Sequence, residues 1–193
     1  MTIAQTSARE RVTAVAERLF AERGYKAVTL RDIAEELGIR QASLYYHFPG
    51  GKEELYVTVT ERGLRAHAEG LQQAIREAGP HLDAQLWAVL EWLVSHPPID
   101  LARMLLADFP AVSSEHAKRL TQLTVESLVQ PIEAMIRAAK DRREARVESD
   151  RLAATLVLTT AEGVVAASRL TDRQPRDLVR EAVATLVSGL RRQ

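Results

Sequence analysis

The sequence predicts an all-α protein in which a small N-terminal three-helix domain precedes a larger helical domain. Apolar residues recur at helical spacing along nearly the whole chain, and no segment alternates convincingly with the two-residue period of a strand. Glycine or proline closes most of the apolar stretches. A chain of 193 residues, 46% of them apolar, is long enough to bury the cores of such a protein.

The first predicted helix runs from Ser7 to Gly24. Ser7 and Glu10 have the spacing of a capping box, and Gly24 is suited to end the helix. The apolar residues of this segment fall on one helical face, which predicts burial of that face: Val12, Val15, Ala16, Leu19 and Phe20.

Two short helices follow, at 29–38 and 41–48, and only a brief turn separates them. A helix-turn-helix needs a small residue where the helices cross, a residue tolerant of unusual backbone angles in the turn, and an apolar anchor in the second helix. Ala34, Gly38 and Leu44 meet these demands in order. Ile39 and Phe48 are expected to close the unit against the first helix.

Six further helices are predicted from apolar spacing and from glycine and proline breaks, at about 52–78, 82–96, 100–108, 115–140, 148–171 and 176–191. Pro131 is expected to bend the helix that contains it. The charged segment 140–150 is expected to be a solvated connection.

The last two helices have apolar faces wider than packing on one side requires, and residues 152–167 read LAATLVLTTAEGVVAA. Such faces favour a homodimer formed through these helices, since monomers avoid large exposed apolar patches. The alternative is that both helices complete the core of one chain.

Charge and composition exclude several classes of protein. The 26 basic and 26 acidic residues balance, so a polyanion would have to meet a local patch. The chain has no cysteine, which removes disulfides and thiolate chemistry and fits a reducing compartment. No signal peptide and no stretch long enough to span a membrane is recognised, so a cytoplasmic protein without membrane contact is expected.

A local basic patch is present in the segment RQASLYYHFPGGK, residues 40–52. Residues 1–55 hold eight basic and eight acidic side chains, yet this segment holds Arg40, His47 and Lys52 and no acid. In a major groove, Gln41 suits an adenine edge, Arg40 suits guanine or phosphate, and Ala42 suits a thymine methyl. Hydroxyl and imidazole groups suit phosphates, and Ser43, Tyr46 and His47 carry them in this segment. Thr29 adds a hydroxyl at the N-terminus of the preceding helix, where a phosphate could also bind. Two roles stay open for Tyr45, namely packing in the core and contacting DNA.

The segment LFAERGYKAVTLRDIAEELGIRQASLYYHFPGGKEEL, residues 19–55, closely resembles the TetR family of bacterial transcriptional regulators. The resemblance implies a DNA-binding domain at 1–50, an effector-binding and dimerisation domain at 51–193, and a dimer formed by the last two helices. It also implies a repressor that leaves a palindromic double-stranded DNA operator when a small effector binds. Its DNA-contact candidates are Thr29, Arg40, Gln41, Ser43, Tyr45, Tyr46, His47 and Lys52, to which Ala42 is added from the groove argument.

The effector pocket is expected to accept a largely apolar or amphipathic molecule. Candidate lining residues are the large apolar side chains of the second domain: Trp87, Trp92, Met104, Phe109 and Met135. Plain core packing is the competing explanation for each of them. Pro131 is a candidate for the pocket opening.

Enzyme activity, a cofactor and a metal site are not expected. Ser113, Ser114, Glu115 and His116 include the side chain types of a hydrolase, but neighbours in sequence seldom form a triad, and a helix cap explains the serines better. The five histidines lack metal-ligand spacing. The rival reading is a helical protein-interaction module without sequence-specific DNA binding.

Overall fold

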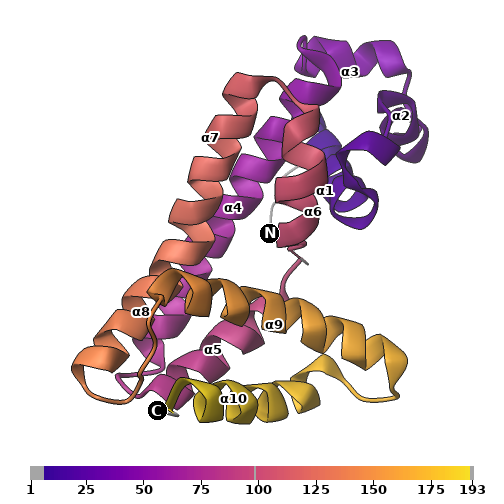
Figure 1. The fold of residues 1–193 in the computed structure, drawn as a ribbon. Helices are drawn as coiled ribbons and strands as arrows, with labels where there is room; N and C mark the ends of the chain where they lie inside the picture. Colours follow the sequence, from indigo (N-terminus) through magenta and orange to yellow (C-terminus); the bar gives the residue numbers. More distant parts are fainter. Residues whose placement is uncertain (1–6, 98, 192–193) are drawn as a thin grey trace, which may run out of the picture. The chain divides into compact units, whose positions relative to one another are not determined.

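The computed structural model describes residues 7–97 and 99–191, and all regular secondary structure in these residues is helical (Figure 1). The all-α prediction is confirmed. The chain divides into two compact units, here called the N-terminal unit (Met1–Gly63 and Ala102–Gln122) and the C-terminal unit (Leu64–Leu101 and Leu123–Gln193). The division into functional domains at residue 50 remains a prediction. The two structural units have other bounds than these domains, because the segment 102–122 belongs to the N-terminal unit.

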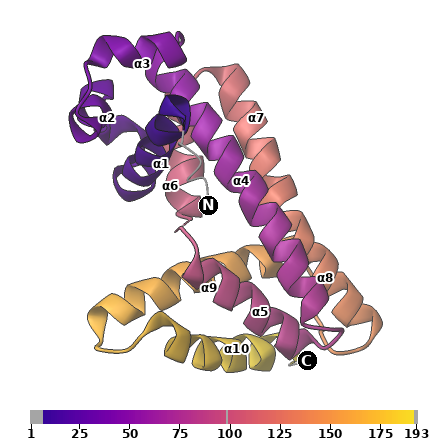
Figure 2. The ribbon, with the colours of Figure 1, turned by 180° about the vertical axis from the view of Figure 1, so that it is seen from behind.

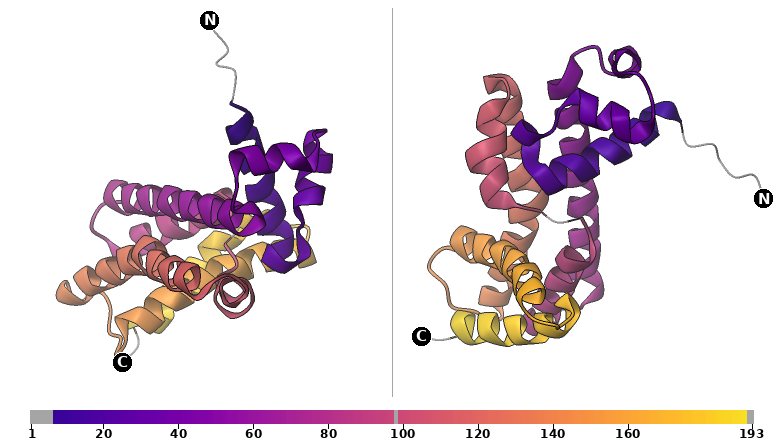
Figure 3. Two further views of the ribbon diagram at one scale, coloured as in Figure 1. Left: turned by 90° about the horizontal axis from the view of Figure 1, so that it is seen from above. Right: turned by 90° about the vertical axis from the view of Figure 1, so that its right-hand side faces the viewer.

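The N-terminal unit consists of three consecutive helices, the start of a long fourth helix, and a later irregular segment. The elements are α1 (Ala8–Ala27), α2 (Leu30–Leu37), α3 (Gln41–His47), the first half of α4 (Gly51–Glu77), and then α6 (Leu101–Arg103), the π-helix η1 (Met104–Asp108), the 3₁₀ turn η2 (Phe109–Ala111) and α7 (Ser114–Thr124). Helix α1 crosses the N-terminal half of α4 (Figure 3), and Arg62 of α4 donates to the Thr13 hydroxyl of α1 over 3.3 Å.

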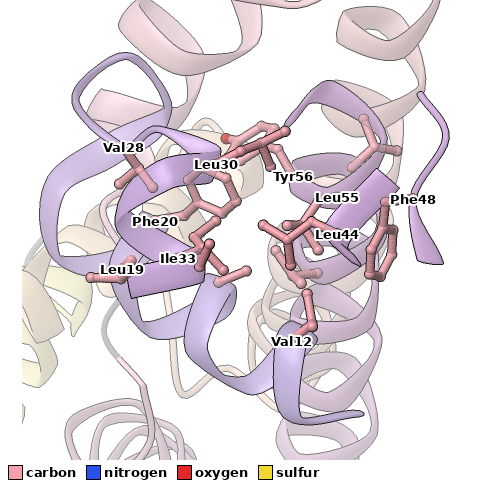
Figure 4. Packing of buried hydrophobic residues seen from close by; sticks show 14 of the residues in the cluster. Val12, Leu19, Phe20, Val28, Leu30, Ile33, Leu44, Phe48, Leu55 and Tyr56 are labelled. Atoms are coloured by element: carbon pink, nitrogen blue, oxygen red, sulfur yellow. The ribbon is translucent and has the colours of Figure 1, made fainter. Parts of the chain in front are cut away.

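The core of the N-terminal unit draws on α1, α2, α3, α4, η2 and α7, and Figure 4 shows part of this cluster. Leu19, Ile33, Leu44, Phe48 and Leu55 are at most 1% exposed. The predicted anchors of the helix-turn-helix are therefore buried together. Ile39 differs from its prediction, because it lies in the turn with 37% of its surface exposed and does not close the core.

Helix boundaries follow the predicted caps. Both capping boxes form, with Ser7 and Glu10 at the start of α1 and Thr29 and Asp32 at the start of α2. Gly24 leaves the helical conformation at φ 80° and ψ 167°, as expected of a helix-ending glycine.

The C-terminal unit contains the remainder of α4, α5 (Leu82–Ser95), the π-helix η3 (Val125–Val129), α8 (Gln130–Asp141), α9 (Asp150–Leu170) and α10 (Pro175–Arg191). Helices α9 and α10 form an antiparallel hairpin (Figure 2), and α9 also packs on α5 and α8. By length and composition alone α9 qualifies as a membrane span, so the expectation that no stretch reaches that length is wrong.

Two further expectations are refined by this unit. The interruption at Pro131 takes the form of a π-helical turn directly before it, in which the Gln130 N–H donates to the Val125 carbonyl. The connection after α8 was predicted to be solvated, but part of it packs on the unit. Ala145 is 3% exposed, and the Glu144 carboxylate accepts a hydrogen bond from the Leu82 N–H over 2.7 Å.

Candidate nucleic-acid interface

The turn between α2 and α3 is a Schellman motif. Gly38 adopts φ 65° and ψ 29°, and the Ile39 N–H donates to the Ala34 carbonyl over 3.0 Å while the Gly38 N–H donates to the Glu35 carbonyl over 3.1 Å. A side chain at position 38 would meet no atom within 4 Å, so the positive φ angle is the only local reason for glycine. This turn sets the angle at which α3 leaves α2.

Helix α3 has one buried side and one exposed side. Leu44 and the following Phe48 are 0% exposed, and they hold the helix against the core. The other side carries most of the residues predicted to contact DNA, and Tyr46 is 84% exposed. The exposed set in and before the helix is Arg40, Gln41, Ala42, Ser43, Tyr45 and Tyr46, with His47 partly buried.

Tyr45 is 48% exposed, and the core aromatic that sequence reasoning missed is Tyr56 at 3%. Tyr56 lies edge-on to Phe20, with ring centroids 5.1 Å apart, and also packs on Tyr25. Tyr56 lies in the second turn of the long helix α4, and its neighbours in the sequence do not mark it as buried. To predict that Tyr56 is buried, one must know which face of α4 packs against α1.

The Thr29 hydroxyl is already engaged in its capping box. It donates to an Asp32 carboxylate oxygen over 2.7 Å, and the same oxygen accepts the Thr29 N–H over 2.7 Å. The hydroxyl and the N–H of Thr29 are thus both occupied. A phosphate contact by Thr29 remains a prediction, and it would require this box to open.

Lys52 lies beside an aromatic ring at the start of α4. Its ammonium is 4.2 Å from the centre of the Tyr25 ring. Burial lowers the pKa of Lys52, while the charges of Asp108 and Asp32 oppose the shift. A phosphate contact by Lys52 also remains a prediction, and it would exchange this ring contact for a phosphate.

Arg9 contacts the end of α3, which the sequence did not indicate. Its guanidinium donates to the His47 carbonyl over 3.3 Å and lies 4.6 Å above the centre of the Phe48 ring. The pattern of α1 places Arg9 on a polar face. The structure is needed to show that the polar partner of Arg9 is the His47 carbonyl.

Ser113, His116 and Glu53 come together, but without the geometry of a hydrolase. His116 Nδ1 lies 3.0 Å from the Ser113 hydroxyl and 2.6 Å from a Glu53 carboxylate oxygen. A catalytic relay needs the serine and the acid on opposite ring nitrogens, and here both contact the same one. The His116 and Ser113 hydrogen bonds lower the pKa of Glu53 to about 2. The arrangement fastens the start of α7 to the start of α4.

The five predicted effector-binding residues are divided between the two units. Phe109 is 2% exposed in the core of the N-terminal unit, and Met104 packs against that core. For these two, core packing within the helix-turn-helix unit replaces the expected place in a second domain. Trp87, Trp92 and Met135 lie in the C-terminal unit, where Met135 is 3% exposed, and a ligand-binding role for them stays a prediction.

Two open grooves mark the described surface of the C-terminal unit. One, of about 630 Å³, has Pro131 among its lining residues, together with Ile75 and Arg76 of α4 and Arg137 of α8. The other, of about 490 Å³, is lined by Trp87 of α5 and by α10 residues that include Arg180 and Val187. Pro131 thus lines a groove, as its candidate role as an opening requires.

The buried His67 of α4 and the partly buried Trp92 and His96, at the end of α5, form an aromatic group. The Trp92 and His96 rings stack with centroids 3.4 Å apart, and His67 lies edge-on to His96. Burial and the neighbouring His96 lower the pKa of His67 to about 4. Among the described residues, neither His67 Nδ1 nor Trp92 Nε1 has a hydrogen-bond partner. No group of three or more metal-ligating side chains lies close enough to hold a metal in the described part of the chain.

Comparison with known proteins agrees with the helix-turn-helix geometry. Residues 12–59 match the family described as "Bacterial regulatory proteins, tetR family". The HTH-type transcriptional repressor KstR2 of Rhodococcus jostii is 36% identical over 119 residues, which is 58% of this chain and 55% of that repressor. A regulatory protein of the tetR family from Rhodococcus RHA1 superposes with a TM-score of 0.75 at 21% identity, covering 96% of this chain and 98% of that one. FadR of Bacillus subtilis, solved with stearoyl-CoA, superposes with a TM-score of 0.68 at 17% identity, covering 93% and 98% of the two chains.

The matched sequence covers about half of the length of the KstR2 relatives, between 46% and 55%. The solved structures share the fold across nearly the whole chain. The helix-turn-helix, the family match over residues 12–59 and the fold agree with one another, and this N-terminal segment is that of the tetR family of bacterial regulatory proteins.

Proposed function

We propose that the chain is a DNA-binding transcriptional regulator, most simply a repressor, that inserts α3 into the major groove of a double-stranded operator. The observation that carries this proposal is the acid-free exposed side of α3, whose opposite side is fixed by the fully buried Leu44 and Phe48. Polar, aromatic and basic side chains on a rigid short helix suit base edges and phosphates. The repressor names of the KstR2 relatives support the direction of regulation.

DNA containing the region upstream of the protein's own gene provides the first test, in a gel-shift assay. Tyr46→Ala and His47→Ala are expected to weaken binding while circular dichroism remains that of the folded protein. Exposed tyrosines also suit a protein surface, so the rival function is a protein-interaction module. Unchanged DNA binding in both variants would remove α3 from the interface.

The homodimer is proposed to form through α9 and α10. Leu152, Leu156 and Leu170 of α9 are 60%, 52% and 85% exposed, and with Gly163 they follow one side of the helix. Burying this face against a second copy would remove it from water. We expect wild type to sediment as a dimer and Leu156→Glu as a monomer, whereas a monomeric wild type would contradict the assembly.

Two copies related by a two-fold axis would present two α3 helices to successive major grooves, about 34–36 Å apart, which implies a palindromic operator. A ligand that binds the DNA-incompetent arrangement more tightly would release the operator. This role requires the regulator to work where the chromosome lies, in the cytoplasm. It requires no catalysis, cofactor or membrane.

The effector is proposed to be a largely apolar or amphipathic small molecule bound by the C-terminal unit. The aromatic group of His67, Trp92 and His96 in the C-terminal unit supports an apolar site, and the FadR neighbour was solved with the amphipathic stearoyl-CoA. Native mass spectrometry of the purified protein is expected to detect a copurifying molecule, and adding that molecule back should release DNA. A copurifying molecule that leaves DNA binding unchanged would contradict its role as effector.

A further inference from the structure

We propose that Arg9 is a positioning residue for the recognition helix α3, holding the C-terminal end of that helix through the His47 carbonyl and the Phe48 ring. The inference rests on the proposed DNA binding by α3. Arg9 lies in the first turn of α1, and its guanidinium donates to the His47 carbonyl over 3.3 Å. The same group lies 4.6 Å above the centre of the Phe48 ring.

Helix α3 needs outside support at this end. It has 7 residues, and helices this short do not persist on their own. The last carbonyls of any helix lack partners within it, and Arg40 provides no side-chain hydrogen bond at the other end. Near the end of α3, the Phe48 N–H donates to Leu44 and the Gly51 N–H donates to Phe48, over 2.8 and 2.9 Å. Arg9 adds a partner for the His47 carbonyl between these two bonds.

The cation also suits its place electrostatically. Carbonyl groups at the C-terminal end of a helix carry partial negative charge, so a guanidinium there is favourable. Phe48 follows directly as the residue that ends the helix, and it is 0% exposed. By covering the Phe48 ring while bonding the carbonyl before it, Arg9 restrains both the end of α3 and its apolar anchor.

Both contacts at once call for arginine. A guanidinium donates hydrogen bonds along its edge and stacks with its flat face, whereas a lysine ammonium is a compact point charge without a face. Arg9→Lys therefore keeps the charge and loses the combined contact. A residue that merely attracted a phosphate would be replaced well by lysine, which separates positioning from direct DNA contact.

The DNA test uses a duplex that wild type selects from random DNA, with poly(dI-dC) as the non-specific probe, in fluorescence anisotropy over a range of salt. Arg9→Gln and Arg9→Lys are both expected to bind the selected duplex about tenfold more weakly, which is about 1.4 kcal/mol. Their affinity for poly(dI-dC) should change less than twofold. The matched control is Arg11→Gln, which removes an exposed cation two residues away on another face of α1.

Hydrogen exchange provides a second readout that needs no DNA. The amides of Phe48 and Gly51 report the two hydrogen bonds that end α3, and both should exchange about tenfold faster in Arg9→Gln and Arg9→Lys than in wild type or Arg11→Gln. If the wild type selects no duplex, the proposed function fails, while exchange still decides whether Arg9 holds α3.

Two results would overturn the inference. In the first, Arg9→Lys binds like wild type while Arg9→Gln loses about 0.9 from the slope of log affinity against log salt, which marks a single phosphate contact. In the second, the Phe48 and Gly51 amides exchange at wild-type rates in both variants.

Discussion

The backbone N–H of Tyr25 donates to the side-chain carboxylate of Asp108 over 2.9 Å, although 83 residues separate them along the chain. In an unbroken helix this N–H would bond the Ala21 carbonyl, but Gly24 interrupts the helix at φ 80°. Arg103 donates to that same Ala21 carbonyl over 2.6 Å and lies 3.5 Å from Asp108. One ion pair thus satisfies both backbone groups that the break in α1 leaves open.

This arrangement explains why residues 102–122 belong to the N-terminal unit. The Asp108 side chain is 5% exposed and the Arg103 side chain is 25% exposed, so both are shielded from water. Buried charges of this kind need partners, and each has a backbone group of α1 as well as the other. The end of α1 is therefore built partly by a segment that follows α5.

Removal of Asp108 should destabilise the protein. Asp108→Ala leaves the Tyr25 N–H and the Arg103 cation without this partner, and we expect the free energy of unfolding to fall by about 3 kcal/mol. Asp108→Asn keeps an acceptor for the N–H and should lose about half as much. Urea unfolding followed by circular dichroism measures both. The exposed Asp172→Ala should stay within about 0.5 kcal/mol of wild type, and an equal result for Asp108→Ala would refute this role.

Replacement of Gly38 by alanine tests the turn before α3. A methyl group there meets no neighbour within 4 Å, so the whole cost is the strain of an L-residue at φ 65°, about 1 to 2 kcal/mol. Gly63→Ala is the matched control, since Gly63 lies inside α4 without a positive φ angle and alanine favours helices. Thermal unfolding should separate the two variants in opposite directions. A neutral Gly38→Ala would mean that the turn does not need its left-handed residue.

The bond from His116 to Glu53 predicts a dependence of stability on pH. Because the folded protein lowers the pKa of Glu53 from 4.5 to about 2, its carboxylate stabilises the fold above pH 4.5. That contribution is lost as the pH falls from 4.5 toward 2. With solvent screening of a partly exposed pair, we expect about 1 kcal/mol.

The measurement compares urea unfolding of wild type and Glu53→Gln at pH 6 and at pH 3. The difference between them should shrink at the lower pH, whereas the exposed Glu69→Gln should show no such trend. A constant difference at both pH values would show that the ionised carboxylate is not what stabilises the contact.

Gly70 has no room for a side chain. A methyl group at this position would overlap the six-membered ring of Trp92, which is itself stacked on His96. Gly70→Ala should therefore cost about 2 to 3 kcal/mol by overpacking. Trp92→Leu, destabilising on its own, should be nearly neutral in the Gly70→Ala background. A double-mutant cycle by urea unfolding measures this coupling, and strictly additive losses would contradict the close approach.

Sequence reasoning predicted the parts of this protein that are fixed locally. The caps at Ser7 and Thr29, the turn at Gly38 and the burial of Leu44 and Phe48 each follow from residues within one or two helical turns, and all are present. The spacing of apolar residues predicts which face of a helix is buried, and the capping residues predict where the helix begins.

The parts that were missed depend on distant partners. Apolar spacing marks Phe109 as buried but does not say against which helices, and the structure places it in the helix-turn-helix core. Likewise, no nearby residue in the sequence indicates that Arg9 contacts His47 or that Asp108 contacts Tyr25. Polar contacts between segments far apart in sequence leave no periodic pattern, so they required the structure.

The most direct test of the proposed function is selection of duplexes from random DNA by the purified wild-type protein, followed by sequencing of the bound fraction. The account predicts enrichment of one palindromic sequence whose half-sites are centred about one helical turn, or a multiple of it, apart, and loss of that enrichment in Tyr46→Ala. A bound fraction with no enriched sequence, from a folded and dimeric protein, would contradict it.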